Sequence, residues 1–472
     1  MTKEKVWARI IEYGILALVI FSPLPAASVY EWSILVIQLT ALALIAVYFL
    51  MREKPQTNAS LSSSLKWPRY LFLGFSIFIL VQIIPLPKIL IKLLSPETFS
   101  FQKLFSVDLS NKKFMSLSLL PSHTLEQGLE LLSCFLVGFL IIKTITKRGQ
   151  IIRLYSVLVA MGVFEAFYGL FELYSKNPRI LFYRKIYYLD SVSGTFINRN
   201  HFSGYLEMII PLSIGLILAR INLFYMPGLK WRERLLRLSE KGFAVNLLIS
   251  LAIIIMGVAI VFSKSRSGIF LLVFSFLLFF VLIAPYFSGP SYQKKWIKNF
   301  LRIVFIIIIV ISLFIGIDTT IAKFAPEKLL QEQRPTFWAN TIHLVSQFPV
   351  FGSGLGTFPS LYPDFDGEEG PLRLAHAHND YLEFLSELGI VGMILLLGGV
   401  LFIIIKSFLT WRIRKHPEVK GLALGGIVAS LCILVHSITD FNLHIPANIL
   451  LFSVVLSLTL VTSFFKRRDK NQ

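Results

Sequence analysis

The residues with the clearest chemical potential stand together in one short run, His376-Ala377-His378-Asn379-Asp380. The run lies within a polar, Gly-rich segment, 334–392, and directly precedes a long apolar stretch. A histidine that a carboxylate orients is the usual general base near neutral pH. We therefore expect one of the two histidines to act chemically and the other to be structural; two solvated loop histidines are the plain alternative.

The spacing of His376 and His378 argues against a metal site. Residues two apart cannot share one helical face, whereas two ligands of one metal commonly stand at i and i+4 of a helix. A metal here would need an unusual local fold. We expect neither a metal nor a cofactor.

Carboxylates follow on the helix that we predict to begin near Asp380. Glu383 and Glu387 stand one helical turn apart on it. Together with the residues that directly follow His378, this makes Asn379, Asp380 and Glu387 supporting candidates for the site. Asp380 and Glu383 could instead be favourable charges in the first turn of a helix.

A second polar cluster, residues 436–444, fills the last loop before the final apolar run. It contains Asp440 and His444, and ionisable groups at membrane depth are functional candidates by default. Helix capping by Asp440 or Asn442 is the alternative.

Three arginines stand at the ends of apolar runs. Arg199 lies in Gly-Thr-Phe-Ile-Asn-Arg-Asn-His-Phe-Ser-Gly-Tyr, Arg266 in Ser-Lys-Ser-Arg-Ser-Gly, and Arg334 opens an amphipathic stretch. Arginine suits phosphate because its planar fork donates hydrogen bonds in pairs. A Ser/Gly turn with Lys264 beside Arg266 favours an anion site, and snorkelling to lipid headgroups is the alternative.

The glycines of Gly352-Ser-Gly354-Leu-Gly356 resemble a phosphate-binding loop only in composition. No predicted strand precedes them and no Gly-Lys-Ser/Thr follows, so neither nucleotide fingerprint is present. We interpret them as residues that permit a turn after Pro349.

Composition defines the scaffold that must hold these residues. The 472-residue chain is 55% hydrophobic and only 15% charged, whereas a soluble domain carries about 25% charged residues. The net charge of +19 fits cytoplasmic loops rich in Lys and Arg better than nucleic-acid binding. Cys134 and Cys432 lie in apolar runs, which excludes a disulfide framework.

Apolar runs predict an all-α integral membrane protein with about twelve transmembrane helices. An uncleaved first span fits the charge alternation better than a signal peptide. The predicted spans are 8–24, 32–50, 69–86, 126–143, 151–173, 202–219, 244–262, 268–286, 300–317, 381–405, 419–438 and 445–464.

Charge places both termini in the cytoplasm, because the segments then assigned to that side hold most of the 46 basic residues. The outside face carries loops at 88–125, 174–201 and 263–267 and the large loop 318–380. We therefore divide the chain into spans one to nine within 1–317, the large loop, and spans ten to twelve within 381–472. An amphipathic helix of about fourteen residues is expected from Arg334, ending before Pro349.

These motifs resemble the O-antigen ligase and O-antigen polymerase superfamily of bacterial membrane glycosyltransferases. The pattern R-x3-W…P-x2-G-x-G-x-G-x-F…H-x-H-N-x-Y-L-x4-E-x-G runs from Arg334 to Gly389, and the related signature spans 199–392. The resemblance implies His378, directly before Asn379, as the general base. It implies Arg199, Arg266 and, more weakly, Arg334 as ligands of a substrate diphosphate. The supporting candidates, which rest on the residues themselves, are His376, Asn379, Asp380, Glu387, Asp440 and His444.

The resemblance also implies an activity. Such proteins transfer a glycan from a polyprenyl (undecaprenyl) diphosphate carrier to an acceptor hydroxyl at the periplasmic face of the inner membrane, without metal. The acceptor is lipid A core in an O-antigen ligase, a glycan in an exopolysaccharide polymerase, or a protein in an O-glycan ligase. The sequence leaves these acceptors open.

A transporter or flippase for a lipid-linked sugar is the alternative of another class. Such a protein would carry ionisable residues deep in its spans. Glu165, Glu172 and Glu207 are the best candidates. The polar chemistry of the large outside loop favours the transferase.

Overall fold

The computed structural model describes residues 3–52, 59–105, 113–220, 241–286, 291–315, 317–325, 332–365 and 374–465. The basic loop 221–240 and the C-terminal Lys-Arg-Arg-Asp-Lys, on which the cytoplasmic placement of the ends partly depends, lie outside these ranges. So do the segments 106–112, 326–331 and 366–373 of the predicted outside loops.

Helices form nearly all of the described structure, as the apolar runs predict. A helix covers most or all of every predicted span. These helices are α1 (Lys3–Phe21), α2 (Glu31–Leu50), α4 (Lys66–Ile83), α7 (Pro121–Thr144), α8 (Arg148–Leu173), α9 (Arg199–Ala219), α11 (Lys241–Phe262), α12 (Arg266–Tyr286), α13 (Ser291–Ile315), α18 (Asp380–Ile413), α19 (Pro417–His436) and α20 (Pro446–Phe464).

Ten of the described helices are long and apolar enough to cross a membrane. α1 and α4 are not among them; the first contains Glu12 and several basic residues, and the second begins with Lys66 and Arg69. The chain is therefore a multi-pass membrane protein. The count of twelve spans and the side of the termini stay predictions.

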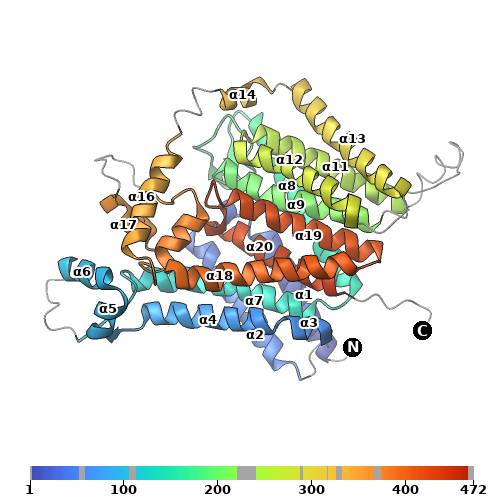
Figure 1. Cartoon of the computed structure of the whole chain (residues 1–472). Helices are drawn as coiled ribbons and strands as arrows, with labels where there is room; N and C mark the ends of the chain where they lie inside the picture. The colour runs from blue at the N-terminus through green and yellow to red at the C-terminus, as the bar shows by residue number, and fades with distance from the viewer. Residues whose placement is uncertain are drawn as a thin grey trace, which may run out of the picture.

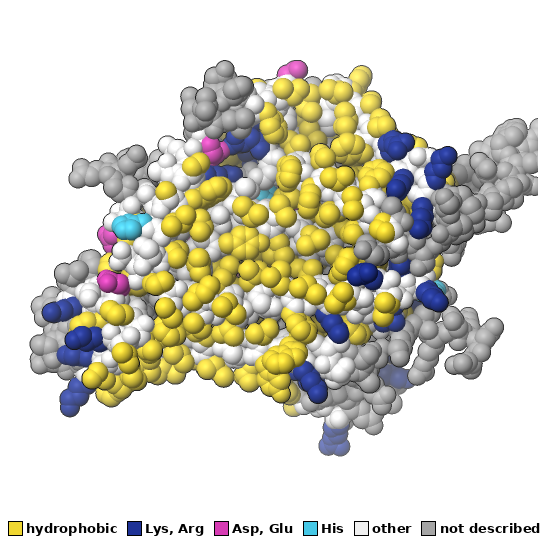
Figure 2. Space-filling model, viewed as in Figure 1, with side chains coloured by type: hydrophobic (Ala, Val, Ile, Leu, Met, Phe, Trp, Pro, Cys, Tyr) yellow, Lys and Arg dark blue, Asp and Glu magenta, His cyan; other side chains and the backbone are white. Residues whose placement is uncertain are grey.

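The long helices run side by side, and several short elements gather at one end of the bundle (Figure 1). Hydrophobic side chains cover the visible face along the helices, while Lys and Arg lie toward the two ends (Figure 2). This distribution is that of a helix bundle whose middle faces lipid.

The remaining described elements are shorter and lie outside the bundle of long helices. Those at or near the end that carries α16 are α5 (Lys88–Leu94), α6 (Pro96–Phe105), β1 (Leu86–Pro87) paired with β2 (Phe114–Met115), β3 (Arg179–Ile180) paired with β4 (Tyr183–Arg184), α14 (Asp318–Ile321), η3 (Ala322–Phe324), α16 (Arg334–Gln347), α17 (Phe358–Leu361), η4 (Tyr362–Phe365) and η5 (Asn442–His444). Two more connect spans, η1 (Ala26–Ser28) and α3 (Ala59–Ser64). α16 has the predicted length and ends before Pro349, as expected.

The centre of the bundle is formed by α9, α19 and α20, which are almost entirely buried. Glycines let α9 and α19 touch backbone to backbone. A Cβ at Gly425 would lie 2.7 Å from the carbonyl oxygen of Pro211, and one at Gly421 would lie 2.7 Å from that of Gly215. Small residues at such contacts are typical of helix packing in membranes. The site described below is built on the outer ends of these helices.

α18 is interrupted near its start by the Gly-rich turn. Gly389 has φ 60°, outside the helical region, and a Cβ there would lie 2.4 Å from the carbonyl of Val350. The turn hydrogen-bonds to the interrupted backbone, with Ile390 N donating to Pro349 O at 2.9 Å and Gly354 N to Glu387 O at 2.9 Å. The Gly352–Gly356 segment is therefore a packing turn, as the sequence indicated.

Candidate functional site

Asp440 is the centre of the polar cluster at the outer end of the bundle. Its side chain is fully buried. Oδ1 lies 3.1 Å from His378 Nδ1, and Oδ2 accepts a hydrogen bond from Asn200 Nδ2 at 2.6 Å. Arg334 Nη2 lies 3.4 Å from Oδ2, and His201 Nε2 lies 3.6 Å from Oδ1. One carboxylate thus joins α9, α16, the 376–380 segment and the loop after α19.

The electrostatics of the cluster keep Asp440 ionised. Burial alone would raise the pKa of Asp440, but the neighbouring imidazoles of His201 and His378 and the charge of Arg334 hold it well below its usual range. A permanently charged carboxylate beside His378 fixes the ring orientation and stabilises an imidazolium if the ring gains a proton.

His378 is held in a strained backbone position and is partly open to solvent. Its φ is 50°, a value that non-glycine residues adopt in only a few per cent of cases. Trp338 Nε1 donates to the His378 carbonyl oxygen at 3.3 Å, and the Phe337 ring stacks at 6.4 Å. The side chain is 25% exposed, and Nδ1 faces Asp440.

Asn379 and Asp380 shape the start of α18. The side chain of Asn379 is the N-cap and accepts from Tyr381 N and Leu382 N at 3.0 and 3.1 Å. Asp380 reaches across to the loop before α20 and accepts from Leu443 N at 3.0 Å. Both residues therefore hold His378 against the loop that carries Asp440.

The arginines lie around the same cluster. Arg266 begins α12 and forms an ion pair with Glu332, and Arg334 Nε lies 3.5 Å from the other oxygen of Glu332. Because Arg334 also contacts Asp440, the predicted anion ligands and the predicted base share one region. Arg199 adjoins it too, since the next residue, Asn200, donates to Asp440.

Arg199 has unused hydrogen-bonding capacity. Its guanidinium lies over the Tyr188 ring, 5.0 Å from the centroid. Its Nε is buried and has no hydrogen-bond partner among the described residues. A buried donor without an acceptor is unfavourable by about 1–3 kcal/mol, so this side chain is suited to an anionic ligand.

The Ser-Arg-Ser-Gly segment is tied to the loop of Asp440. α12 begins at Arg266 itself, so the turn before it is shorter than predicted. Ser267 Oγ and Thr439 Oγ1 lie 2.9 Å apart. Lys264, expected to add charge for an anion, is instead paired with Asp190 at 2.9 Å.

Glu387 lies away from this cluster. Its Oε1 accepts from Phe358 N at 3.0 Å and so anchors the first turn of α17 beside the Gly-rich turn. The second oxygen is buried without a hydrogen-bond partner among the described residues. Its visible role is to hold the backbone rather than to contact His378 or the arginines.

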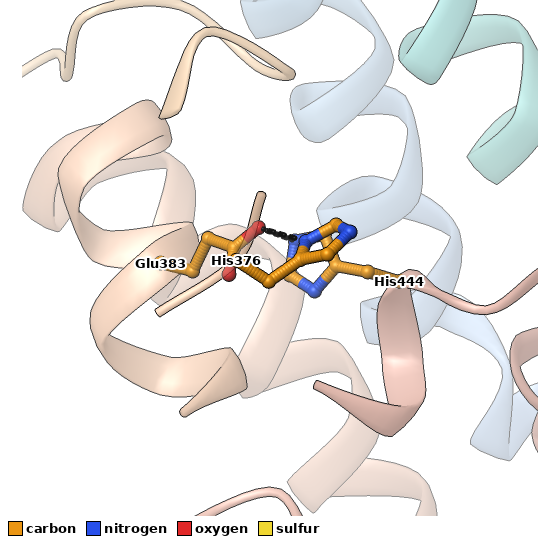
Figure 3. A group of neighbouring side chains, drawn as sticks. All are labelled: His376, Glu383 and His444. Carbon is orange, nitrogen blue, oxygen red and sulfur yellow. Dashed lines mark hydrogen bonds and ion pairs between the residues drawn. The ribbon is translucent and has the colours of Figure 1, made fainter. Parts of the chain in front are cut away.

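His376 and His444 form a separate group with Glu383 (Figure 3). His376 Nδ1 lies 2.7 Å from Glu383 Oε1, and His444 Nε2 lies 3.4 Å from the same oxygen. His444 Nδ1 lies 2.6 Å from Asp380 Oδ1. Although burial lowers the pKa of His444, the carboxylates of Glu383 and Asp380 raise it to about 10.

Phe441 separates the imidazoles of the two groups. Its ring stacks on His376 at 4.1 Å and meets His378 at 4.9 Å and His201 at 4.4 Å edge to face. Because an apolar ring fills the space between them, the three imidazoles are held apart by packing.

A cavity of about 390 Å³ opens beside α18. Apolar side chains of α4, α7, α18 and α20 form most of its wall. Asp380 and Tyr381 lie at one part of the lining, and Arg69 and Lys143 at another. The cavity thus adjoins the start of α18 at Asp380 and Tyr381.

Four partners of the site were not among the predicted site residues: Asn200, His201, Glu332 and Glu383. Asn200 and His201 directly follow Arg199, so adjacency could have indicated them. No sequence pattern indicated Glu332, because nothing in its sequence context predicts a contact with Arg266, which is 66 residues away in the chain.

Comparison with known proteins bears on the same region. Residues 251–397 match the family model described as O-Antigen ligase. The matched range includes Arg266, Arg334, His376 and His378, while Arg199 and Asp440 lie outside it. A search of curated proteins found no match. Over residues 251–397, the chain is therefore similar to the O-antigen ligase family.

Proposed function

We propose that the protein transfers a glycan from a polyprenyl diphosphate carrier to an acceptor hydroxyl, in the manner of an O-antigen ligase. The observation that carries this proposal is the arrangement of His378, paired with Asp440, next to the arginines. The family match supports an activity of the ligase or polymerase type.

His378 acts as the general base in this proposal. With Nδ1 oriented by Asp440, Nε2 removes the proton of the acceptor hydroxyl as its oxygen attacks the anomeric carbon of the donor sugar. Such proton transfer contributes about 10²–10⁴-fold to rate. Direct displacement with one base predicts inversion at the anomeric carbon.

Arg199, Arg266 and Arg334 bind the diphosphate. As the bond between sugar and phosphate breaks, negative charge develops on the leaving oxygen, and fixed cations stabilise it. Arg199 offers its unpaired Nε, while Arg266 and Arg334 must exchange the Glu332 carboxylate for phosphate oxygens. Because the donor is already activated, the transfer needs no nucleotide and no metal at these residues.

The apolar cavity beside α18 is suited to a hydrocarbon chain of a lipid-linked substrate. Its lining is mostly apolar and adjoins Asp380 at the start of α18. We place the site at the periplasmic face of the bacterial inner membrane, with both termini cytoplasmic and twelve spans.

The transporter alternative has less support. The buried glutamates that favoured it are engaged in local pairs: Glu165 accepts from Thr195 N at 2.9 Å, Glu172 pairs with Lys185 at 3.3 Å, and Glu207 lies 3.0 Å from His436. Removing one partner of such a pair would leave the other buried and unpaired, which is destabilising, so these pairs account for the glutamates without a transport role.

Purified protein in detergent with a polyprenyl diphosphate-linked glycan tests the proposal. The expected result is release of the polyprenyl diphosphate with glycan attached to lipid A core, to another glycan or to a protein acceptor. A deletion strain distinguishes these acceptors by loss of glycan on the lipid anchor, of chain length or of protein glycosylation. Movement of labelled carrier across vesicles without a transfer product would overturn the proposal in favour of the transporter.

A further inference from the structure

The group formed by His376, Glu383 and His444 takes no part in the proposed transfer. One ligand atom from each residue can be chosen so that all three atoms lie within 4.8 Å of one another. They come from three elements: the segment before α18, the first turns of α18, and η5 before α20 (Figure 3). We propose that these residues bind a divalent transition-metal ion, with Zn²⁺ the best match.

The donor set favours zinc. Two imidazole nitrogens and one carboxylate oxygen are a set that zinc adopts with a fourth position left for water. Harder ions such as Mg²⁺ and Ca²⁺ prefer sites built from oxygen alone.

The spacing of each histidine to Glu383 needs little change for a metal. A tetrahedral ion about 2.0–2.1 Å from each ligand separates the ligand atoms by roughly 3.4 Å. His444 Nε2 and Glu383 Oε1 are already 3.4 Å apart. His376 Nδ1 and Glu383 Oε1 are 2.7 Å apart. The ion would replace the proton that these two atoms share, and the distance between them would increase by less than about 1 Å.

One ligand atom is presented without any other role. The His444 side chain is 7% exposed, and its Nε2 has no hydrogen-bond partner among the described residues although it faces Glu383. Its Nδ1 contacts Asp380 Oδ1 at 2.6 Å. A carboxylate on the far nitrogen of a ligating histidine orients the ring so that Nε2 faces the metal position.

The proposal revises the sequence-based expectation of no metal. That expectation considered only His376 and His378, which are too close in sequence to share a helical face. The structure supplies His444 in place of His378, with Glu383 between the two histidines in space. The ion would join the segment that carries His378 to the loop that carries Asp440, so its role is structural and separate from the transfer step.

Metal analysis of the purified full-length protein tests the site independently of transferase activity. Protein loaded with Zn²⁺ and then desalted is expected to retain about one ion per chain. Glu383→Gln and His444→Gln should each lower this to below roughly one fifth. The matched control is His123→Gln, because His123 is exposed and outside the group.

A second measurement covers variants that fail to fold. Wild-type protein loaded with Co²⁺ should show the intense visible absorption of tetrahedral coordination, and Zn²⁺ should displace it. Wild-type protein that binds no Zn²⁺, or Glu383→Gln protein that folds and binds as much as wild type, would overturn the proposal. Wild-type protein that retains Zn²⁺ but transfers no glycan would instead count against the proposed function alone.

Discussion

His378 Nδ1 lies 3.1 Å from Oδ1 of Asp440, a residue 62 positions later in the chain. The contact joins the segment before α18 to the loop after α19, and the same carboxylate also meets Asn200 and Arg334. A base and the group that orients it are thus assembled from segments that are far apart in sequence. The predictions below test what this assembly does.

Replacing His378 by Gln is expected to lower the rate of glycan transfer by about 10²–10⁴-fold, because the acceptor hydroxyl loses its base. Donor binding should change little. Expression and membrane insertion should match wild type, as measured by membrane fractionation and fluorescence size-exclusion chromatography. Full activity in this variant would remove His378 from the role of base.

Asp440→Asn is expected to lower kcat by about 10²-fold or more, since the His378 ring loses the charge that orients it and stabilises its protonated form. The control is Asp318→Asn, because Asp318 lies at the exposed start of α14. A variant that folds and retains wild-type kcat would show that Asp440 only holds the loop. Steady-state transfer kinetics at saturating donor make the measurement.

Arg199→Lys and Arg266→Lys are expected to raise KM for the diphosphate donor by roughly tenfold, because lysine keeps the charge but loses the paired donors of the guanidinium. KM for the acceptor should change less. Arg184→Lys, in β4, is the matched control outside the cluster. Unchanged donor KM in both variants would place the diphosphate elsewhere.

Glu332→Gln is expected to lower the KM for donor by up to about fivefold. Glu332 pairs with Arg266 and approaches Arg334 in the ligand-free protein, so phosphate must compete with its carboxylate. Both guanidinium groups are partly exposed, and ion pairs of this kind contribute about 0.2–1 kcal/mol. A raised donor KM would instead assign Glu332 to holding the arginines in place.

Gly389→Ala is expected to destabilise the protein by several kcal/mol, because the new Cβ would meet the Val350 backbone at 2.4 Å. Gly398→Ala, later in the same helix, is the matched control, since nothing lies within 4 Å of a Cβ built there. Thermal unfolding in detergent compares the two. Equal melting temperatures of the two variants would mean that the Gly-rich turn can move away from α18 at no cost in stability.

Much of the architecture follows from composition. Long apolar runs must become helices in a bilayer, because the helix is the conformation in which a single segment satisfies all of its own backbone hydrogen bonds. The amphipathic stretch from Arg334 and the turn at Pro349 are likewise local properties. For this reason α16 has the expected length and end.

The partnerships within the site could not be predicted in the same way. Asp440 was one candidate among several, and only tertiary packing brings His378, Asn200 and Arg334 to it. Glu387 shows the converse, because its position suggests chemistry but its carboxylate caps the backbone at Phe358. Pairing across tens of residues depends on how helices pack, which local sequence patterns do not encode.

The Phe441 ring, set between His376, His378 and His201, has a consequence for proton traffic. A hydrocarbon ring cannot relay protons, so the ring blocks direct proton transfer between these imidazoles, and His378 and His201 meet only at the Asp440 carboxylate. In the proposed mechanism, the proton that His378 takes from an acceptor leaves through the exposed quarter of its own side chain. Each turnover then depends on water reaching that edge once the product has moved away.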